Sequence, residues 1–231
     1  MPPRAPAERR ELMDAEPSEP GEIAGALREL ARVNRLLGGR RTTLAHLGRL
    51  LAATGQRRVS VLDVAAGGGD MAEAMVAWGA RRGWELRFTF VDRHPFVLAR
   101  VERESRFRPG LVRGDALELP FRDDSFDLCV TSLFFHHLEA AGTRAALGEM
   151  RRVARTGVLV NDLVRDRIAW GWIVLLSRLF SRNRLVRHDG PLSVLRAYRP
   201  ADFRRLAREG GLSEWGVRRH FPYRMCLWGL V

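Results

Sequence analysis

The sequence predicts an α/β fold built on a doubly wound, mostly parallel sheet of seven strands. Three observations predict this class. Short runs rich in β-branched residues alternate with helical patterns from residue 59 to residue 163. Three consecutive glycines, Gly67 to Gly69, follow the first run, where a strand would turn into a helix. Two final apolar runs, 215–221 and 225–231, are joined across Pro222 and predict a closing antiparallel hairpin.

The N-terminal part is expected to begin with a tail and to continue as two helices. Residues 1–20 have little apolar content and predict a mobile tail, in which the patch Glu11–Asp14 is the exception that can dock. Apolar residues at helical spacing predict a helix over 23–37, which a pair of glycines ends. Thr42 or Thr43 is the expected cap of a second helix.

Strands and helices alternate through the centre of the chain, and a helical insertion then breaks the alternation. The expected central strands cover 59–65, 86–91, 111–113, 126–132 and 157–163. The expected helices cover 71–82, 96–104, 139–154 and 200–208. We expect one domain in five parts: the tail (1–20), the N-terminal helices (21–55), the core (56–164), the helical insertion (165–197) and the C-terminal helix with the hairpin (198–231).

All 39 basic residues are arginine, and the formal net charge is +12. Such a charge leaves three alternatives: a solvated arginine surface, an anionic surface as partner, and specific nucleic-acid recognition. Abundant alanine, glycine and leucine suggest a bias toward GC-rich codons, which favours the first alternative. We therefore expect no specific nucleic-acid partner. The longest apolar stretch, 168–180, is too short to span a bilayer.

The cysteines and histidines predict no metal centre. Cys129 and Cys226 lack metal-ligand spacing, and the N-terminus lacks the apolar region of a signal peptide. A reduced, cytoplasmic protein is the simplest expectation. The adjacent His136 and His137 are expected to point different ways and to lack a third ligand, so that no zinc site is predicted.

The run from Val61 to Asp70 is the central ligand-binding signal. Its glycines let the backbone approach a ligand, and the helix that follows favours a carboxylate at its N-terminus. The spacing of Gly67, Gly69 and Ala72 also fits the dinucleotide fingerprint, so this run alone does not identify the ligand.

Three later features separate the possible ligands. Asp92 ends the second strand, where a carboxylate can accept from both ribose hydroxyls, as it also does in nicotinamide enzymes. Asp115 follows the third strand, where it can accept from an adenine amino group. The fourth strand opens at 126–128 and runs out to 136–138. Each carboxylate has a structural alternative as the cap of a turn or helix.

On these motifs, residues 59 to 163 resemble the core of class I S-adenosylmethionine-dependent methyltransferases, especially the quinone-type and small-molecule branch. The resemblance implies a Rossmann-like fold with a C-terminal antiparallel hairpin, and S-adenosyl-L-methionine as the cofactor. Ala65 occupies the first glycine position of the family's motif, and Arg155-Thr156-Gly157 replaces the usual Gly-Gly before strand five.

The resemblance also implies roles for individual residues. Asp92 would bind the ribose and Asp115 the adenine, while Ala65, Gly67 and Gly69 would line the methionine part. The expected cofactor-binding residues are Asp63, Ala65, Gly67, Gly69, Asp92, Arg93, Asp115, Ala116 and Ser132.

A phenol or hydroxyl acceptor would benefit from a general base, for which histidine is suited because it titrates near neutrality. His137, after the fourth strand, is the leading candidate, with His188 and Asp162 as alternatives. Each histidine also has a structural alternative: one of the adjacent pair would pack or cap the next helix, and His188 would be exposed.

The insertion guides the choice of acceptor. Its apolar stretch is wider than one helical stripe. Three alternatives would explain this width: core packing, an acceptor pocket or lid, and weak contact with a membrane surface. Polar groups from Asp189 to Tyr198 could point inward. The whole chain also resembles bacterial small-molecule methyltransferases of polyketide-type pathways, a looser resemblance that rests on Glu11–Asp14, residues 32–35 and this polar run. This resemblance implies an aromatic or lipophilic acceptor.

We therefore expect a methyltransferase that O-methylates a phenolic or lipophilic small molecule in bacterial secondary metabolism. Methylation of carbon or nitrogen on a quinone-like or other small molecule is the alternative. An RNA methyltransferase is less favoured, because Thr131–Phe134 stands where an Asn-Pro-Pro-Tyr-type motif would lie. A nicotinamide-binding protein is the remaining alternative, and the sequence leaves the oligomeric state open.

Overall fold

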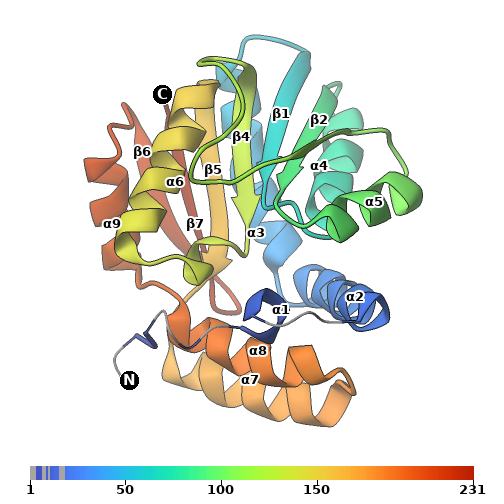
Figure 1. Cartoon of the computed structure of the whole chain (residues 1–231). Coiled ribbons are helices and arrows are strands. Elements are labelled where there is room, and N and C mark those ends of the chain that lie inside the picture. Colours follow the sequence, from blue (N-terminus) through green and yellow to red (C-terminus); the bar gives the residue numbers. More distant parts are fainter. Residues whose placement is uncertain (1–3, 7–8, 10, 16–18) are drawn as a thin grey trace.

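The seven strands form one sheet in the order β3-β2-β1-β4-β5-β7-β6 (Figure 1). β7 runs antiparallel to both of its neighbours, and the other paired strands are parallel. The predicted sheet with its closing hairpin is therefore confirmed. The computed structural model describes residues 4–6, 9, 11–15 and 19–231 of the chain.

The elements follow the predicted order closely. The strands are β1 (Arg58–Val64), β2 (Glu85–Asp92), β3 (Gly110–Arg113), β4 (Phe126–Ser132), β5 (Ala154–Leu163), β6 (Trp215–His220) and β7 (Arg224–Leu230). The helices are α1 (Leu12–Ala15), α2 (Pro20–Leu36), α3 (Gly39–Ala53), α4 (Asp70–Ala80), α5 (Pro95–Glu104), the 3-10 turn η1 (Phe135–His137), α6 (Ala140–Val153), α7 (Arg167–Phe180), α8 (Arg184–Arg196) and α9 (Pro200–Glu209).

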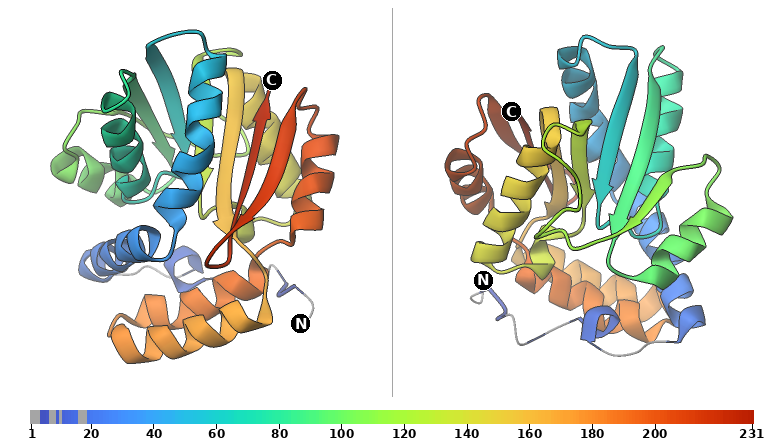
Figure 2. Two further views of the ribbon diagram at one scale, coloured as in Figure 1. Left: turned by 180° about the vertical axis from the view of Figure 1, so that it is seen from behind. Right: turned by 45° about the horizontal axis from the view of Figure 1, so that its top comes forward.

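Helices cover both faces of the sheet and enclose two apolar cores. α3, α4 and α5 pack on one face, and α6 and α9 pack on the other, where Leu147 and Phe203 are fully buried. The central strand β4 is buried along almost its whole length, as expected for a parallel strand covered on both faces. α7 and α8 lie outside these layers, beyond the carboxyl ends of the parallel strands (Figures 1 and 2).

The second N-terminal helix begins earlier than predicted. Gly38, with φ at 79°, is the N-cap residue of α3, and no side chain caps this helix end. Thr42 and Thr43 are instead buried within the helix, where the Thr43 hydroxyl accepts from Asn161 Nδ2 at 2.8 Å. The predicted threonine cap was wrong because a glycine in the left-handed region can turn the chain into a helix without one.

The described part of the 1–20 segment makes polar contacts with distant residues, and the predicted mobility of this segment stays a prediction. The Arg4 guanidinium donates to the carbonyl of Leu138 at 2.6 Å. The carboxylate of Asp189 accepts from the N–H groups of Leu12 and Met13 at 2.8 and 3.1 Å, which fixes α1 against α8. Polar contacts with distant residues hold this segment, and an apolar count along the sequence does not reveal them.

A histidine pair joins α3 to β6 and makes the fold sensitive to acid. The Nε2 atoms of His46 and His220 lie 2.9 Å apart, so one ring must accept the other's proton. Burial, followed by the charges of His220, Arg218 and Arg49, lowers the pKa of His46 from 6.5 to about 4. Because protonation is easier in the unfolded chain, the stability from this neutral pair is present above pH 6.5 and is lost as the pH falls toward 4.

We therefore expect the urea midpoint of the wild-type protein to fall across this pH window. The variant His46→Gln should show a smaller fall, since it removes one of the two titrating rings. Equilibrium unfolding at a series of pH values checks this. Parallel pH profiles of the two proteins would contradict the assignment.

Candidate functional site

The candidate residues gather at one edge of the sheet because the strands that carry them are neighbours. β2, β1, β4 and β5 lie side by side and parallel, so their carboxyl ends meet at the lower edge in Figure 1. Backbone hydrogen bonds tie the turns after these strands: Ala65 N–H donates to Val91 O, and Leu133 N–H donates to Asn161 O, both at 2.9 Å.

The glycine loop after β1 exposes its backbone to a ligand. Ala65 and Gly67 have φ angles of 54° and 52°, in the left-handed region. A Cβ at Gly67 would meet only the Leu27 side chain of α2, at 3.8 Å. A Cβ at Gly69 would instead lie 2.9 Å from the Phe90 ring. Gly67 therefore serves backbone access, whereas Gly69 allows α4 to pack closely on the sheet.

Asp92 ends β2 as predicted, and its carboxylate faces the glycine loop. One oxygen accepts from Gly67 N–H at 3.4 Å, and the other accepts from His94 N–H at 2.9 Å. The side chain is thereby oriented, and its carboxylate still has lone pairs for two hydroxyl groups. Arg93, the next residue, is exposed.

Asp115 lies in an exposed turn after β3. Its carboxylate accepts from Leu117 N–H at 2.8 Å, which is the turn contact that the structural alternative predicted. Ala116 is partly buried against the core that α6 and α9 cover. The turn thus has a fixed shape beside the ends of β2 and β3.

Ser132 and Asp63, near the carboxyl ends of β4 and β1, are polar groups in buried environments. The Oγ of Ser132 is buried at the end of β4, and no described residue forms a hydrogen bond with it. Its neighbour Leu133 has φ at 58°, a strained value that is common at functional sites. Burial, followed by the charges of Asp70 and Asp92, raises the pKa of Asp63 well above its usual value.

A buried histidine–aspartate pair joins the ends of β4 and β5. The Nδ1 of His136 lies 2.6 Å from Asp162 Oδ1, and the His136 N–H donates to the other carboxylate oxygen at 3.0 Å. Burial raises the pKa of Asp162, but the charge of His136 and hydrogen bonds from His136 and Leu163 lower it by more. Asp162 is therefore a carboxylate, which fixes the proton of His136 on Nδ1 and directs Nε2 away from β5.

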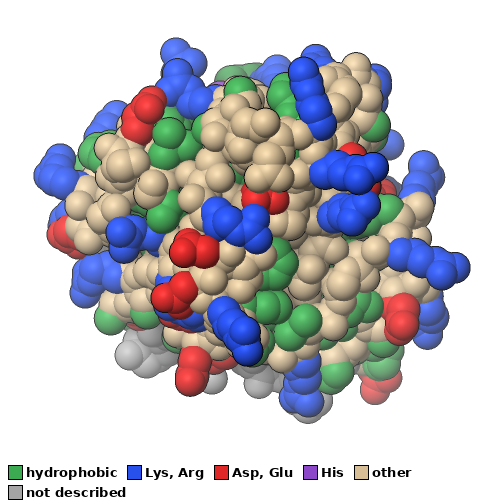
Figure 3. Space-filling view, turned by 90° about the horizontal axis from the view of Figure 1, so that it is seen from above, with side chains coloured by type: hydrophobic (Ala, Val, Ile, Leu, Met, Phe, Trp, Pro, Cys, Tyr) green, Lys and Arg blue, Asp and Glu red, His purple; other side chains and the backbone are tan. Residues whose placement is uncertain are grey.

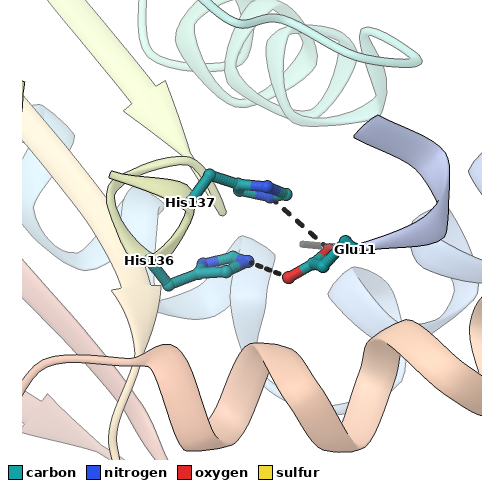
Figure 4. A group of neighbouring side chains, drawn as sticks. All are labelled: Glu11, His136 and His137. Atoms are coloured by element: carbon teal, nitrogen blue, oxygen red, sulfur yellow. Dashed lines mark ion pairs between the residues drawn. The ribbon is translucent and has the colours of Figure 1, made fainter. Parts of the chain in front are cut away.

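Glu11 completes a group of three side chains with the two histidines, as Figure 4 shows. The Glu11 oxygens lie 3.6 Å from His136 Nε2 and 3.8 Å from His137 Nε2. The two rings are 4.3 Å apart and inclined by 33°. The prediction that the histidines point different ways and lack a third ligand was wrong, because η1 turns both rings toward the N-terminal segment. The three ligand atoms lie within 4.8 Å of one another, so these residues could hold a metal ion.

His188 belongs to another part of the surface. Its Nδ1 lies 2.8 Å from Asp189 Oδ1, and its side chain is 45% exposed. It shares a hollow of about 490 Å³ with four arginines: Arg178, Arg182, Arg184 and Arg187. The three base candidates are therefore not one group: Asp162 holds His136, His137 faces Glu11, and His188 faces the arginines.

The polar run after Asp189 points inward, as expected, but it contacts the η1 turn. The buried Arg196 guanidinium donates to the carbonyls of His136, His137 and Arg9, at 3.1, 2.5 and 3.0 Å. The Tyr198 hydroxyl donates to Leu138 O at 2.8 Å. These side chains position the histidines.

Sequence reasoning did not assign Glu11 or Arg196 to this site. It named His137 as the base, with His188 and Asp162 as alternatives, and did not select His136. Ser193 Oγ donates to Glu11 Oε1 at 2.8 Å, so residues 182 positions apart in the sequence meet at the site. Two signals in the sequence could have found these residues together: the docking patch that begins at Glu11 and the polar run of the insertion.

Residues 61–157 match the family model of a methyltransferase domain. A demethylmenaquinone methyltransferase of Roseiflexus sp. is 36% identical over 102 residues, which are 44% of this chain and 41% of that protein. A ubiquinone/menaquinone biosynthesis C-methyltransferase of Cupriavidus taiwanensis is 29% identical over 161 residues, 66% of this chain and 64% of that protein. The chain thus spans less than two thirds of the length of either relative.

The fold is also that of solved methyltransferases. Human N-acetylserotonin methyltransferase, in complex with SAM, superposes with a TM-score of 0.66 at 18% identity, over 98% of this chain and 60% of that one. A SAM-dependent methyltransferase of Aquifex aeolicus gives a TM-score of 0.61 at 16% identity, over 93% of this chain and 100% of that one. At such identities the likeness concerns the fold alone.

Proposed function

Because residues 61–157 match the family model of a methyltransferase domain, we propose that the protein is a class I S-adenosylmethionine-dependent methyltransferase and that it methylates a small lipophilic phenol or quinol. The observation that carries the proposal is the shared edge of the sheet, where the glycine loop and Asp92 lie beside the buried Asp162–His136 pair. The first group suits an adenosyl cofactor, and the second suits a hydroxyl that must lose a proton.

The residues at this edge fit S-adenosyl-L-methionine. The open backbone at Gly67, the oriented carboxylate of Asp92 and the unpartnered hydroxyl of Ser132 offer contacts for an adenosyl and methionine group. The Leu27 side chain of α2 lies next to Gly67 and Gly68 and would border the methionine end. When bound, the cofactor supplies an electrophilic methyl group on a sulfonium.

The residues of the η1 turn would hold the acceptor and take its proton. His136 Nε2 and Glu11 Oε1 are 3.6 Å apart, so one hydroxyl oxygen can lie within hydrogen-bond distance of both. Nε2 would accept the proton, and the resulting imidazolium would lie between the carboxylates of Asp162 and Glu11. Orientation of the acceptor toward the methyl group would supply most of the remaining acceleration.

A phenolate is nucleophilic at its oxygen and at its ortho and para carbons, so one base can serve two outcomes. We favour O-methylation, in bacterial secondary metabolism and in the cytoplasm. C-methylation of a quinol-type ring is the second candidate, and the names of the Roseiflexus and Cupriavidus relatives support it.

The test incubates the protein with methyl-deuterated cofactor and either an alkylphenol or a dihydroxynaphthalene. Mass spectrometry detects methyl transfer, and carbon NMR distinguishes an O-methyl from a C-methyl product. Transfer to one of these acceptors is expected. Transfer to RNA alone would contradict the proposal.

Asp92→Ala is expected to weaken the binding of S-adenosylhomocysteine by about tenfold or more. A charge-assisted hydrogen bond to a hydroxyl contributes roughly 1.5–3 kcal/mol, and the change removes its acceptor. Titration calorimetry on folded protein checks this, with Glu209→Ala on the exposed side of α9 as the matched control. Unchanged affinity, or equal binding of NAD, would assign Asp92 a structural role.

A further inference from the structure

α7 presents its large apolar side chains to solvent. Four of them recur at intervals of four, three and four residues and so form one stripe along the helix. These are Ile168, Trp172, Leu175 and Leu179, which are 60%, 54%, 48% and 65% exposed. Phe180, at the end of the helix, is 80% exposed. A stripe of this length is more than the scattered exposed residues of an ordinary surface.

The face of α7 that packs on the protein combines two small buried side chains with the partly buried Ile173, Val174 and Leu176. Ala169 and Ser177 are buried, and Ile173 lies against Gly190 of α8, with its Cγ1 3.3 Å from where a Cβ of that glycine would be. An amphipathic helix on a protein normally turns its larger apolar face inward. α7 also carries a second apolar face that is exposed, so packing within the chain does not explain the stripe.

Cationic side chains adjoin this stripe where α7 meets α8. Five residues line the hollow of about 490 Å³ there, and none of them is acidic: Arg178, Arg182, Arg184, Arg187 and His188. Of these, Arg184 also lies 3.3 Å from Glu22. On the opposite face of the molecule, arginines are spread around the surface with acidic side chains among them (Figure 3).

We propose that α7 lies flat on the surface of an anionic lipid bilayer. The apolar stripe would enter the boundary between headgroups and acyl chains, and the arginines of the hollow would contact lipid phosphates. No helix in the described part of the chain is long and apolar enough to cross a membrane, so the contact is interfacial. α7 lies on the outer side of α8 in both views of Figure 2, where a planar surface can reach it.

Charge favours a bilayer over a second copy of the chain. In a two-fold dimer built on α7, the stripe of each copy would cover the other, and the same arginines of both copies would approach one another. Anionic headgroups would neutralise them instead. A lipophilic acceptor dissolved in the bilayer would then be close to the η1 turn, which contacts α8. The surface contact itself does not depend on methyl transfer.

The test is flotation of the full chain with vesicles, without cofactor or acceptor. One set contains phosphatidylcholine alone, and the other an equimolar mixture with phosphatidylglycerol. We expect binding to the anionic vesicles and its decrease at high salt. Arg178→Gln and Arg182→Gln should each weaken binding about fivefold. The double variant Trp172→Ser, Leu179→Ser should abolish binding, and Trp172→Phe should retain it.

Leu36→Ser is the matched control, because Leu36 is 71% exposed on α2 and lies outside the stripe. It should bind as the wild type does. Equal binding to both vesicle types, no binding to either, or equal losses in the control and the double variant would overturn the proposal. A dimer in sedimentation that the double variant dissociates, without vesicle binding by the wild type, would assign the stripe to a second copy. The outcome of the vesicle experiment does not change the methyl-transfer assay, which is done in detergent. The proposed membrane contact and the proposed methyl transfer can therefore fail separately.

Discussion

Replacing His136 with alanine is expected to lower the rate of methyl transfer by about 100-fold or more near neutral pH. Nε2 of this residue is the proposed proton acceptor, and its Nδ1 is held 2.6 Å from Asp162. Asp162→Asn should cause a loss of the same order, because the amide cannot stabilise an imidazolium. Both losses should shrink above about pH 10, where a phenol ionises without help.

Stopped-time assays across a pH series, with a phenolic acceptor, check this expectation. His188→Ala is the control, since that side chain faces the arginine hollow and should leave the rate unchanged. His137→Ala separates the two adjacent rings, because a larger loss there than at His136 would make His137 the base. Binding of S-adenosylhomocysteine should be the same in all variants. Wild-type rates in His136→Ala, His137→Ala and Asp162→Asn would remove the general base from the mechanism.

A chelator distinguishes a proton acceptor from a metal centre at the same residues. Activity that survives chelation supports proton transfer to His136. Activity that is lost and then returns with zinc would assign Glu11 and the two histidines to a metal ion.

Arg196→Met is expected to lower the free energy of unfolding by about 2–4 kcal/mol, because the carbonyls of His136, His137 and Arg9 each lose a hydrogen bond at once. The guanidinium joins η1 to the N-terminal segment through His136, His137 and Arg9. The methyl-transfer rate should also fall at temperatures where the variant is folded, because the turn that orients the histidines is released.

Urea unfolding and activity measured on the same preparation check both parts. Arg208→Met on exposed α9 is the matched control and should change stability by less than about 0.5 kcal/mol. Unchanged stability and rate in Arg196→Met would mean that other contacts suffice to hold the turn.

The sheet, and the position of the edge that we propose for the cofactor, could be predicted because their signals are local. β1, the glycine loop and α4 are consecutive in the chain, and Asp92 ends its strand at a position that the apolar pattern marks. Parallel strands bring such ends together in any fold of this class, so residues predicted one by one at strand ends are expected to lie close together. The start of α3 was predicted wrongly, because nothing in the sequence distinguishes Gly38, a helix N-cap with positive φ, from a glycine in an ordinary turn.

The group that we propose as the proton acceptor could not be predicted, because its residues are far apart in the sequence. Glu11 meets residues 136 and 193, and no periodicity relates these positions. The orientation of the two histidine rings depends on the single 3-10 turn of η1, which sequence patterns do not specify. The same limit applied to α7, since its composition alone could not show which face packs on α8.

The contact of Glu11 with Ser193 has a consequence for how the protein is made. Residue 11 is synthesised 182 residues before Ser193, its partner on α8. The N-terminal segment must therefore wait, unpaired, until the sheet and α8 have formed, and closing so long a loop is a late and slow event. Newly made protein should consequently bind the cofactor before it can methylate an acceptor.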